Sequence, residues 1–242
     1  MSDPVVLPDM TEAQAASWHA LLDLYTMVPE RWTLVGGQLV HLHCAERGSY
    51  SVHPTTDADA VVNIRADQQI LTRFTAALAE LGFTPETSGD GHQHRWLNGL
   101  AQVDVLIPEG ICEQAAKLHG VGGAPTVSSP GTTQALRRTE AVEVIVEGRR
   151  GTILRPNLVG SLVGKAAARV DLGGGRAASR HCVDFVILAS LIAARDLRDS
   201  PLDLKDRQRL SRMIPLCRKD GPALLVEEAD EHLDRLQRAI DR

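Results

Sequence analysis

The sequence predicts a mixed α/β (α+β) fold in which strands and helices alternate at first and only helices follow. Two observations carry this prediction. Short apolar runs bounded by Gly, Pro and Asn alternate with helical spacings up to about residue 156. After Pro156, helical spacings alone remain. We therefore expect an α/β unit over residues 1–156 and a helical region over residues 157–242.

Each element of the α/β unit is indicated by a local pattern. Thr11 and Gln14 have the spacing of a capping box, which predicts the start of a helix. Asn98-Gly99 is a strong hairpin signal. Residues 108–139 are rich in Gly, Pro, Ser and Thr and predict no regular element. The expected elements are a helix over 11–27, a strand over 32–35, a helix over 38–46, a strand over 57–64, a helix over 67–81, and hairpins over 92–107 and 141–154.

The helical region is expected to contain helices over residues 157–171, 180–198, 204–214 and 221–241. Gly173-Gly174-Gly175 indicates a flexible connection, because no strand precedes it as a dinucleotide-binding loop requires. The stretch that ends at Lys165 superficially resembles a P-loop. Its glycines are one residue too close, however, and Ala166 replaces the required Ser or Thr. We therefore place Lys165 on a helix.

Composition and charge exclude several classes of protein. Hydrophobic residues make up 43% and charged residues 24% of the chain, which is typical of a globular protein and not of a disordered one. The net charge of −5 argues against general phosphate binding. Residues 1–130 hold 6 basic and 15 acidic side chains, however, whereas residues 131–242 hold 20 and 16. An acidic half therefore precedes a basic half.

The cysteines and apolar runs indicate a cytoplasmic setting without membrane contact. The four cysteines form no CxxC pair, which argues against a zinc ribbon or a dense disulfide framework. The first residues lack the basic and apolar regions of a signal peptide. The longest mostly apolar run, residues 185–194, is far shorter than the roughly 20 residues of a membrane span.

Three carboxylates are candidate metal ligands. Asp57 and Asp59 share one face of a strand, with Cα atoms roughly 6.6 Å apart. Asp104 lies inside an apolar strand, where a carboxylate is costly unless it is paired, hydrogen-bonded or bound to a metal. Carboxylate oxygens are the ligands that Mg²⁺ prefers. The alternatives are a solvated strand end for the pair and a structural cap for Asp104.

Backbone and lysine positions indicate where an anion would bind. Gly36-Gly37 connects a strand to a helix, so that backbone N–H groups can approach an anion at the helix start. Lys165 could reach the phosphates of a nucleotide, or it could be an ordinary surface lysine. Asp184 lies on the next expected helix.

The order of these motifs resembles the DNA polymerase β-like nucleotidyltransferase superfamily, and more narrowly the AbiEii/AbiGii-type toxins, which include the MenT-like toxins. The resemblance runs from about Trp32 to Leu191. The chain departs from the family at two positions. Gln38 stands where the family usually has Ser or Thr, and His53 stands where it often has Arg. The matching residues are Gly36-Gly37, Thr55, Asp57-Ala58-Asp59, His94-Arg95, Val103-Asp104-Val105-Leu106, Lys165 and Asp184.

The resemblance implies a nucleotidyltransferase-type mixed sheet flanked by helices, with the helical region completing the active-site cleft. Asp57, Asp59 and Asp104 would hold Mg²⁺, with Mn²⁺ as the alternative ion. Asp104 could instead help to deprotonate the acceptor hydroxyl. Lys165 would neutralise phosphate charge and Asp184 would position it. Gly36, Gly37, Gln38 and Lys165 are the expected nucleotide-binding residues. Independently of the resemblance, Arg180 is a further candidate for a phosphate contact, with a solvated loop between two helices as the alternative.

The implied activity is transfer of an NMP from an NTP to the 3′ end of tRNA, as the toxin of a toxin–antitoxin system with a cognate antitoxin encoded beside it. Two alternatives stay open. The same site could nucleotidylate a small molecule or a protein, or a degenerate nucleotidyltransferase could act as a binding or regulatory partner. The basic run between Lys205 and Lys219 could bind RNA or form a solvated helix face. The histidines do not have the spacing of a zinc site.

Overall fold

The computed structural model describes residues 3–49, 55–170 and 176–241. His53 and the Gly173–Gly175 run lie outside the described residues. The strands are β1 (Val5–Val6), β2 (Trp32–Val35), β3 (Asp57–Val62), β4 (Thr84–Glu86), β5 (Arg95–Asn98), β6 (Ala101–Pro108), β7 (Val127–Ser129), β8 (Thr139–Val146) and β9 (Arg149–Pro156). The helices are α1 (Glu12–Met27), α2 (Gly36–Glu46), α3 (Ile70–Glu80), α4 (Glu113–Ala116), α5 (Thr132–Arg137), α6 (Leu158–Val170), α7 (Arg176–Leu191), α8 (Ala194–Asp199), α9 (Leu204–Cys217) and α10 (Ala229–Ile240), with a 3₁₀ turn at Ala223–Leu225.

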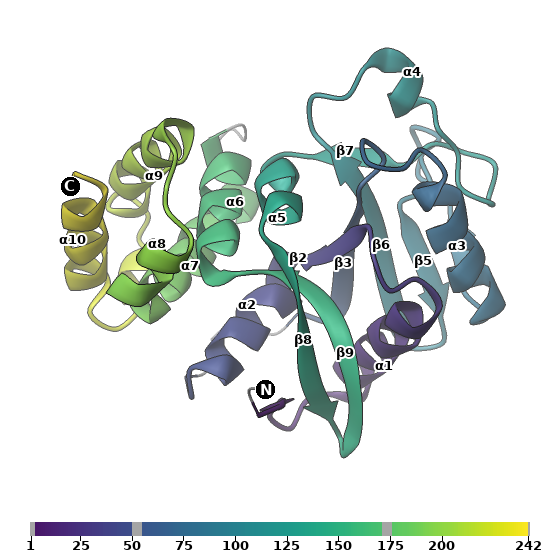
Figure 1. Cartoon of the computed structure of the whole chain (residues 1–242), viewed down its shortest axis with the longest axis horizontal. Helices are drawn as coiled ribbons and strands as arrows, with labels where there is room; N and C mark the ends of the chain where they lie inside the picture. Colours follow the sequence, from purple (N-terminus) through teal and green to yellow (C-terminus); the bar gives the residue numbers. More distant parts are fainter. Residues whose placement is uncertain (1–2, 50–54, 171–175, 242) are drawn as a thin grey trace.

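A mixed six-stranded sheet forms the centre of the α/β unit. Its order is β2-β3-β6-β5-β4, with β7 beside the end of β6. The β3–β6 and β6–β7 pairs are parallel, whereas the other pairs in this sheet are antiparallel. A second sheet, β1-β8-β9, curves beside it (Figure 1). The predicted α+β class is confirmed.

Strand alternation divides the central sheet into a core face and a polar face. Successive side chains point to opposite faces. On β3 and β6, Ala58, Ala60, Val103 and Val105 are fully buried, and α1 packs on these strands. Asp57 and Asp59 alternate with those alanines, and Asp104 lies between the two valines. All three carboxylates therefore lie on the face opposite α1.

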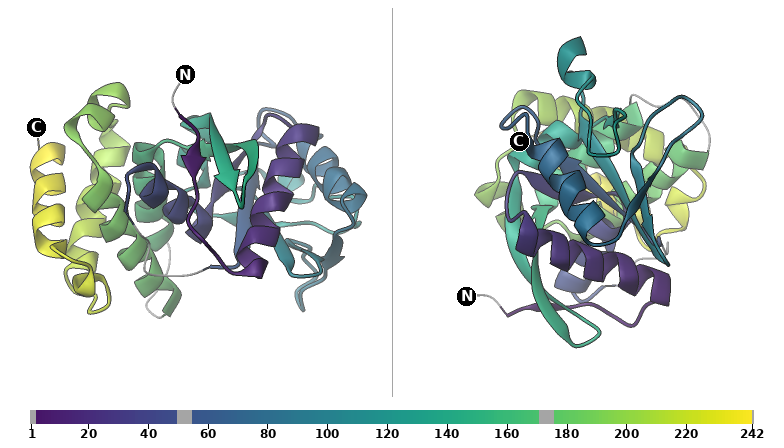
Figure 2. Two further views of the ribbon diagram at one scale, coloured as in Figure 1. Left: turned by 90° about the horizontal axis from the view of Figure 1, so that it is seen from below. Right: turned by 90° about the vertical axis from the view of Figure 1, so that its right-hand side faces the viewer.

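The helices after β9 form one end of the molecule (Figures 1 and 2). Their buried side chains make a hydrophobic cluster of their own, built from α6, α7, α9 and α10. Val40 and Cys44 of α2 also belong to this cluster, so α2 packs against both parts of the chain. The boundary that we predicted at residue 156 coincides with the change of cluster, while a division into two domains stays a prediction.

Local signals explain where most elements begin. The Thr11 side chain accepts a hydrogen bond from the Gln14 backbone N–H at 3.3 Å, and the Gln14 side chain accepts one from the Thr11 N–H at 3.1 Å, which confirms the capping box. The hairpin around Asn98-Gly99 is confirmed, with Asn98 opposite Ala101. The β8–β9 hairpin is longer than predicted and turns at Glu147-Gly148, both of which have positive φ.

Five expectations need correction. The helix expected over 221–241 is a 3₁₀ turn at Ala223–Leu225 followed by α10, which begins at Ala229. The helix expected over 180–198 is two helices, because the Asp196 carboxylate accepts a hydrogen bond from the Ala193 N–H at 2.8 Å and caps a new start there. Residues 108–139 contain α4, β7 and α5. Strands β1 and β4 were not expected. Helix α2 begins at Gly36 and not at Gln38. Among the described residues, no helix is both long and apolar enough to span a membrane.

Candidate active site

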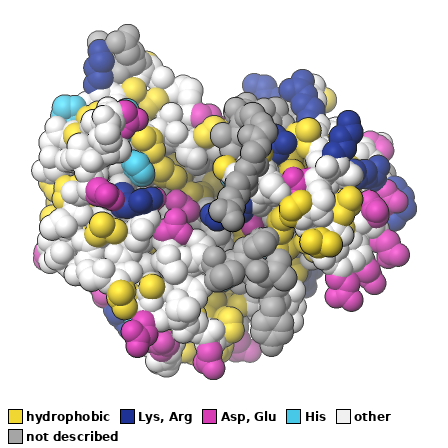
Figure 3. Space-filling model, turned by 180° about the vertical axis from the view of Figure 1, so that it is seen from behind, with side chains coloured by type: hydrophobic (Ala, Val, Ile, Leu, Met, Phe, Trp, Pro, Cys, Tyr) yellow, Lys and Arg dark blue, Asp and Glu magenta, His cyan; other side chains and the backbone are white. Residues whose placement is uncertain are grey.

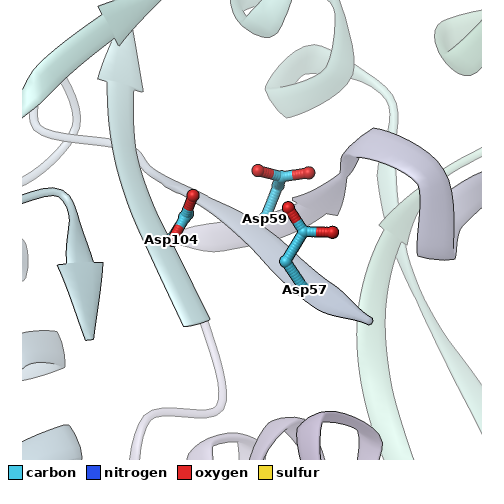
Figure 4. Close-up of side chains that lie close together, drawn as sticks. All are labelled: Asp57, Asp59 and Asp104. Carbon is cyan, nitrogen blue, oxygen red and sulfur yellow. The ribbon is translucent and has the colours of Figure 1, made fainter. Parts of the chain in front are cut away.

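The structure brings the three predicted carboxylates together. Strands β3 and β6 are parallel neighbours, and Asp59 lies directly opposite Asp104 in their register. Asp57 precedes Asp59 by two residues and shares its face of β3. One oxygen from each carboxylate lies within 4.8 Å of the others (Figure 4). This group could hold a metal ion.

The electrostatics of the group favour a cation. Burial, together with the charges of Asp57 and Asp104, raises the pKa of Asp59 from 3.8 to about 7, against the opposing effect of Lys165. The two neighbouring carboxylates therefore disfavour the ionised form of Asp59, which a bound cation would stabilise. Oxygen ligands at this spacing suit a hard divalent cation such as Mg²⁺. The residues present therefore fit a metal ion.

Asp104 has two polar neighbours on the same face of the sheet. Arg95, its cross-strand partner on β5, places two guanidinium nitrogens 3.3 and 3.4 Å from the two carboxylate oxygens. The side-chain amide of Gln102 donates to Asp104 at 3.1 Å. These contacts hold Asp104 in place and partly offset its charge. A two-residue loop at Asn98-Gly99 would set Arg95 opposite Gln102. The loop instead consists of Gly99 and Leu100, which sets Arg95 opposite Asp104.

The glycine turn closes directly over Asp59. Gly36 has φ +74°, and a Cβ atom added there would lie 1.8 Å from Asp59 Oδ2. A Cβ atom on Gly37 would lie 2.5 Å from the Thr55 methyl carbon. Thr55 in turn donates a hydrogen bond from its hydroxyl to Asp57. The start of α2 therefore approaches the carboxylates as closely as a backbone can.

Gln38 is buried and fixes the chain that leads into β3. Its side-chain nitrogen donates to the Thr55 carbonyl at 3.0 Å. Its side-chain oxygen is buried without a hydrogen-bond partner within the described part of the chain. The contact between Gln38 and a nucleotide that we expected from the sequence stays a prediction.

Lys165 and Asp184 form a buried ion pair across the cleft from the carboxylates. The Lys165 Nζ atom lies 2.5 Å from Asp184 Oδ2, and the two residues are 8% and 4% exposed. Lys165 lines a cavity of about 190 Å³ together with Gly36, Asp59 and His181. The predicted lysine therefore shares a cavity with a predicted metal ligand, and Asp184 fixes its position. Arg180 is exposed and does not line this cavity, so its nucleotide contact stays a prediction.

Sequence reasoning did not single out His181. It lies three residues before Asp184, so both side chains project from one face of α7. Burial and the charge of Lys165 lower the pKa of His181 from 6.5 to about 4. No motif indicated this residue, because its position depends on how α7 packs against α6.

The comparisons with known proteins support the fold. No family model matches the chain, and no curated protein matches its sequence. An antigenic nucleotidyltransferase-like protein from Paracoccidioides brasiliensis has a similar crystal structure, with TM-score 0.50 and 12% identity over 89% of this chain and 94% of that one. The solution structure of the antibiotic-resistance factor ANT(2'')-Ia covers 87% of this chain and 98% of its own, with TM-score 0.44 and 12% identity. The likeness to the Paracoccidioides brasiliensis protein shows that the chain has a nucleotidyltransferase-like fold.

Proposed function

We propose that this protein is a metal-dependent nucleotidyltransferase that transfers an NMP from an NTP to an acceptor. One observation carries the proposal. Three carboxylates on adjacent strands have oxygens within 4.8 Å of one another, and one of them, Asp59, lies beneath the glycine start of α2 and lines a cavity with Lys165. The start of α2 and the Lys165 ammonium suit the phosphates of a triphosphate, and the carboxylate cluster suits its metal ion.

The residues divide the work by their chemistry. Divalent cations held by Asp57, Asp59 and Asp104 would neutralise charge on the triphosphate and on the departing pyrophosphate. Lys165 would contact phosphate oxygens, and Asp184 would keep its ammonium group directed into the cavity. The backbone N–H groups at Gly36 and Gly37 would bind a further phosphate. Positioning and charge stabilisation supply most of the catalysis in phosphoryl transfer.

We further propose Mg²⁺ as the ion and the 3′ end of tRNA as the acceptor, with the protein acting as the toxin of a toxin–antitoxin pair. The resemblance of the ordered motifs to AbiEii/AbiGii-type nucleotidyltransferases supports these finer assignments. The acidic carboxylate cluster and the basic second half of the chain suit a metal–NTP complex and an RNA.

The basic run of α9 gives only part of an RNA-binding surface. Arg218 pairs with Asp234, and Arg207 donates to the Ile240 carbonyl. On the face that Figure 3 shows, basic and acidic side chains are mixed over the helical region. On this face an RNA would therefore meet separate cations and not a continuous basic groove, and the RNA contact of this run stays a prediction.

Labelled nucleotide transfer tests the proposal. The protein is incubated with each α-labelled NTP, Mg²⁺ and total tRNA, and the RNA is separated on a denaturing gel. We expect labelled tRNA from the wild type and a loss of at least about 100-fold in Asp57→Ala and Asp59→Ala. Asp199→Ala, which removes an exposed carboxylate at the end of α8, is the matched control and should keep full activity.

The same assay separates the alternative acceptors. Label in the protein fraction or in a small-molecule fraction that still depends on Asp57 would show that tRNA is not the acceptor. Such a result would still support the nucleotidyltransferase activity. Label that persists in Asp57→Ala and Asp59→Ala would refute the proposed active site. A wild type without transfer to any acceptor and without Mg²⁺-dependent NTP binding would favour the regulatory alternative.

A further inference from the structure

The cavity beside Asp59 is too small for a whole nucleotide. Its volume is about 190 Å³, whereas pockets for drug-sized ligands measure about 300–1,000 Å³. Asp59 and Gly36 border it on one side, and Lys165 and His181 of the helical region border it on the other. A triphosphate bound at Asp59 and Lys165 would leave room here for only the adjoining part of the ligand.

Several polar side chains that line this cavity, Lys165 among them, are already engaged within the protein. The Ser161 hydroxyl lies 2.7 Å from His43 Nε2 and donates to the Asn157 carbonyl at 3.1 Å. The Thr132 hydroxyl donates to Glu109 at 2.9 Å. In contrast, His181 Nδ1 is buried and has no hydrogen-bond partner among the described residues. Buried polar atoms without partners are rare, and a missing ligand is one explanation for them.

The charge of His181 limits what it can bind. The charged groups that act on it are Lys165, Asp184, Arg169 and Arg180. Burial and the nearby cations hold its pKa near 4, so the imidazole is neutral at pH 7. A neutral imidazole has one donor and one acceptor nitrogen, which suits a hydroxyl or a base edge better than a phosphate.

We propose that His181 recognises the nucleoside part of the bound NTP by a hydrogen bond to an uncharged group, either a sugar hydroxyl or a base edge. His181 is then a specificity-determining residue, because a nucleoside without the matching group leaves the imidazole unpaired. The inference rests on the proposed function, since the triphosphate bound at Asp59 and Lys165 delivers the nucleoside to the cavity.

Binding calorimetry with Mg²⁺ tests the inference without an acceptor. The probes are the four ribonucleoside triphosphates, their 2′-deoxy forms and inorganic tripolyphosphate, which has no nucleoside. His181→Ala should weaken the preferred NTP about 3- to 10-fold, the loss of one hydrogen bond. The affinity of His181→Ala for tripolyphosphate should stay within about 2-fold of the wild-type affinity. His181→Asn, which keeps a hydrogen-bonding amide, should recover most of the loss. His232→Ala on α10 is the control and should match the wild type.

The pattern across probes identifies the group that His181 contacts. If the partner is a sugar hydroxyl, the wild type prefers ribonucleotides over 2′-deoxynucleotides and His181→Ala loses that preference. If it is a base edge, the variant loses the preference among the four bases. Equal weakening of NTP and tripolyphosphate, or unchanged NTP binding in a folded His181→Ala protein, would overturn the inference. A wild type that binds no nucleoside triphosphate and no tripolyphosphate would instead refute the proposed function, on which the inference depends.

Discussion

Replacing Gly36 with alanine should separate the site from the fold, because the added methyl group is aimed at a metal ligand. The φ of +74° costs an alanine about 1–2 kcal/mol by itself. The new Cβ atom would also lie 1.8 Å from Asp59 Oδ2 and 2.7 Å from Asp59 Cγ. Ordinary contacts are about 3.5 Å or longer, so the carboxylate must move by more than about 1 Å.

Displacement of this size should affect binding more than stability. Turning Asp59 away from its rotamer adds about 1 kcal/mol, so we expect Gly36→Ala to lower the free energy of unfolding by about 2–3 kcal/mol in total. A shift of about 1 Å in a catalytic group can cost about 100-fold in rate. We therefore expect a loss of about 100-fold in nucleotidyl transfer, together with weaker Mn²⁺ binding by calorimetry.

Gly48→Ala is the matched control for backbone strain. Gly48 has φ +64°, and nothing lies within 4 Å of an added Cβ atom. It should lose about 1–2 kcal/mol of stability and keep full activity. In an Asp59→Ala background, Gly36→Ala should cost only this backbone amount. Chemical denaturation measures the stabilities. Equal metal affinity and activity in Gly36→Ala and Gly48→Ala would refute the reasoning.

Three further predictions follow from the charges of the site. Asp184→Asn should lower the free energy of unfolding by about 3–5 kcal/mol, because it leaves the buried Lys165 cation without a partner. The double variant Lys165→Met/Asp184→Leu should lower it far less. Chemical denaturation measures both. As the pH falls from 6.5 towards 4, unfolded His181 gains a proton that the folded state resists, so the wild type should lose up to about 3 kcal/mol more stability than His181→Asn. Equal pH profiles would contradict this. Mg²⁺ at 100 times its Kd should add about 2.7 kcal/mol, or about 5–10 °C in Tm, and should have no effect on Asp57→Asn.

Local sequence signals predicted much of the fold and of the site, because they act at short range. The Thr11–Gln14 capping box marks the start of α1, and Asn98-Gly99 marks the hairpin between β5 and β6, although the loop itself is Gly99-Leu100. Alternation along β3 then put Asp57 and Asp59 on one face. The parallel pairing that brings Asp104 beside them was implied by family resemblance and not by any local pattern.

The parts that the sequence did not predict depend on distant contacts. β1 is two residues long and exists because Val5 pairs with Val144. α5 lies in a segment without helical spacing, and Glu109 holds its start through Thr132 and Thr133. His181 has no local signature, since its shifted pKa comes from burial beside Lys165. Each of these features requires tertiary packing that a single sequence does not reveal.

The position of α2 has a consequence for the order in which the site is completed during synthesis. Its first residues approach Asp59, while His43 near its other end contacts Ser161 of α6. The carboxylates belong to the first half of the chain, but Lys165 and Asp184 belong to the last third. A growing chain can therefore pair β3 with β6 long before any lysine faces them. Until α6 and α7 dock, the acidic cluster lacks its opposing wall, so a chain that ends before α6 should be inactive.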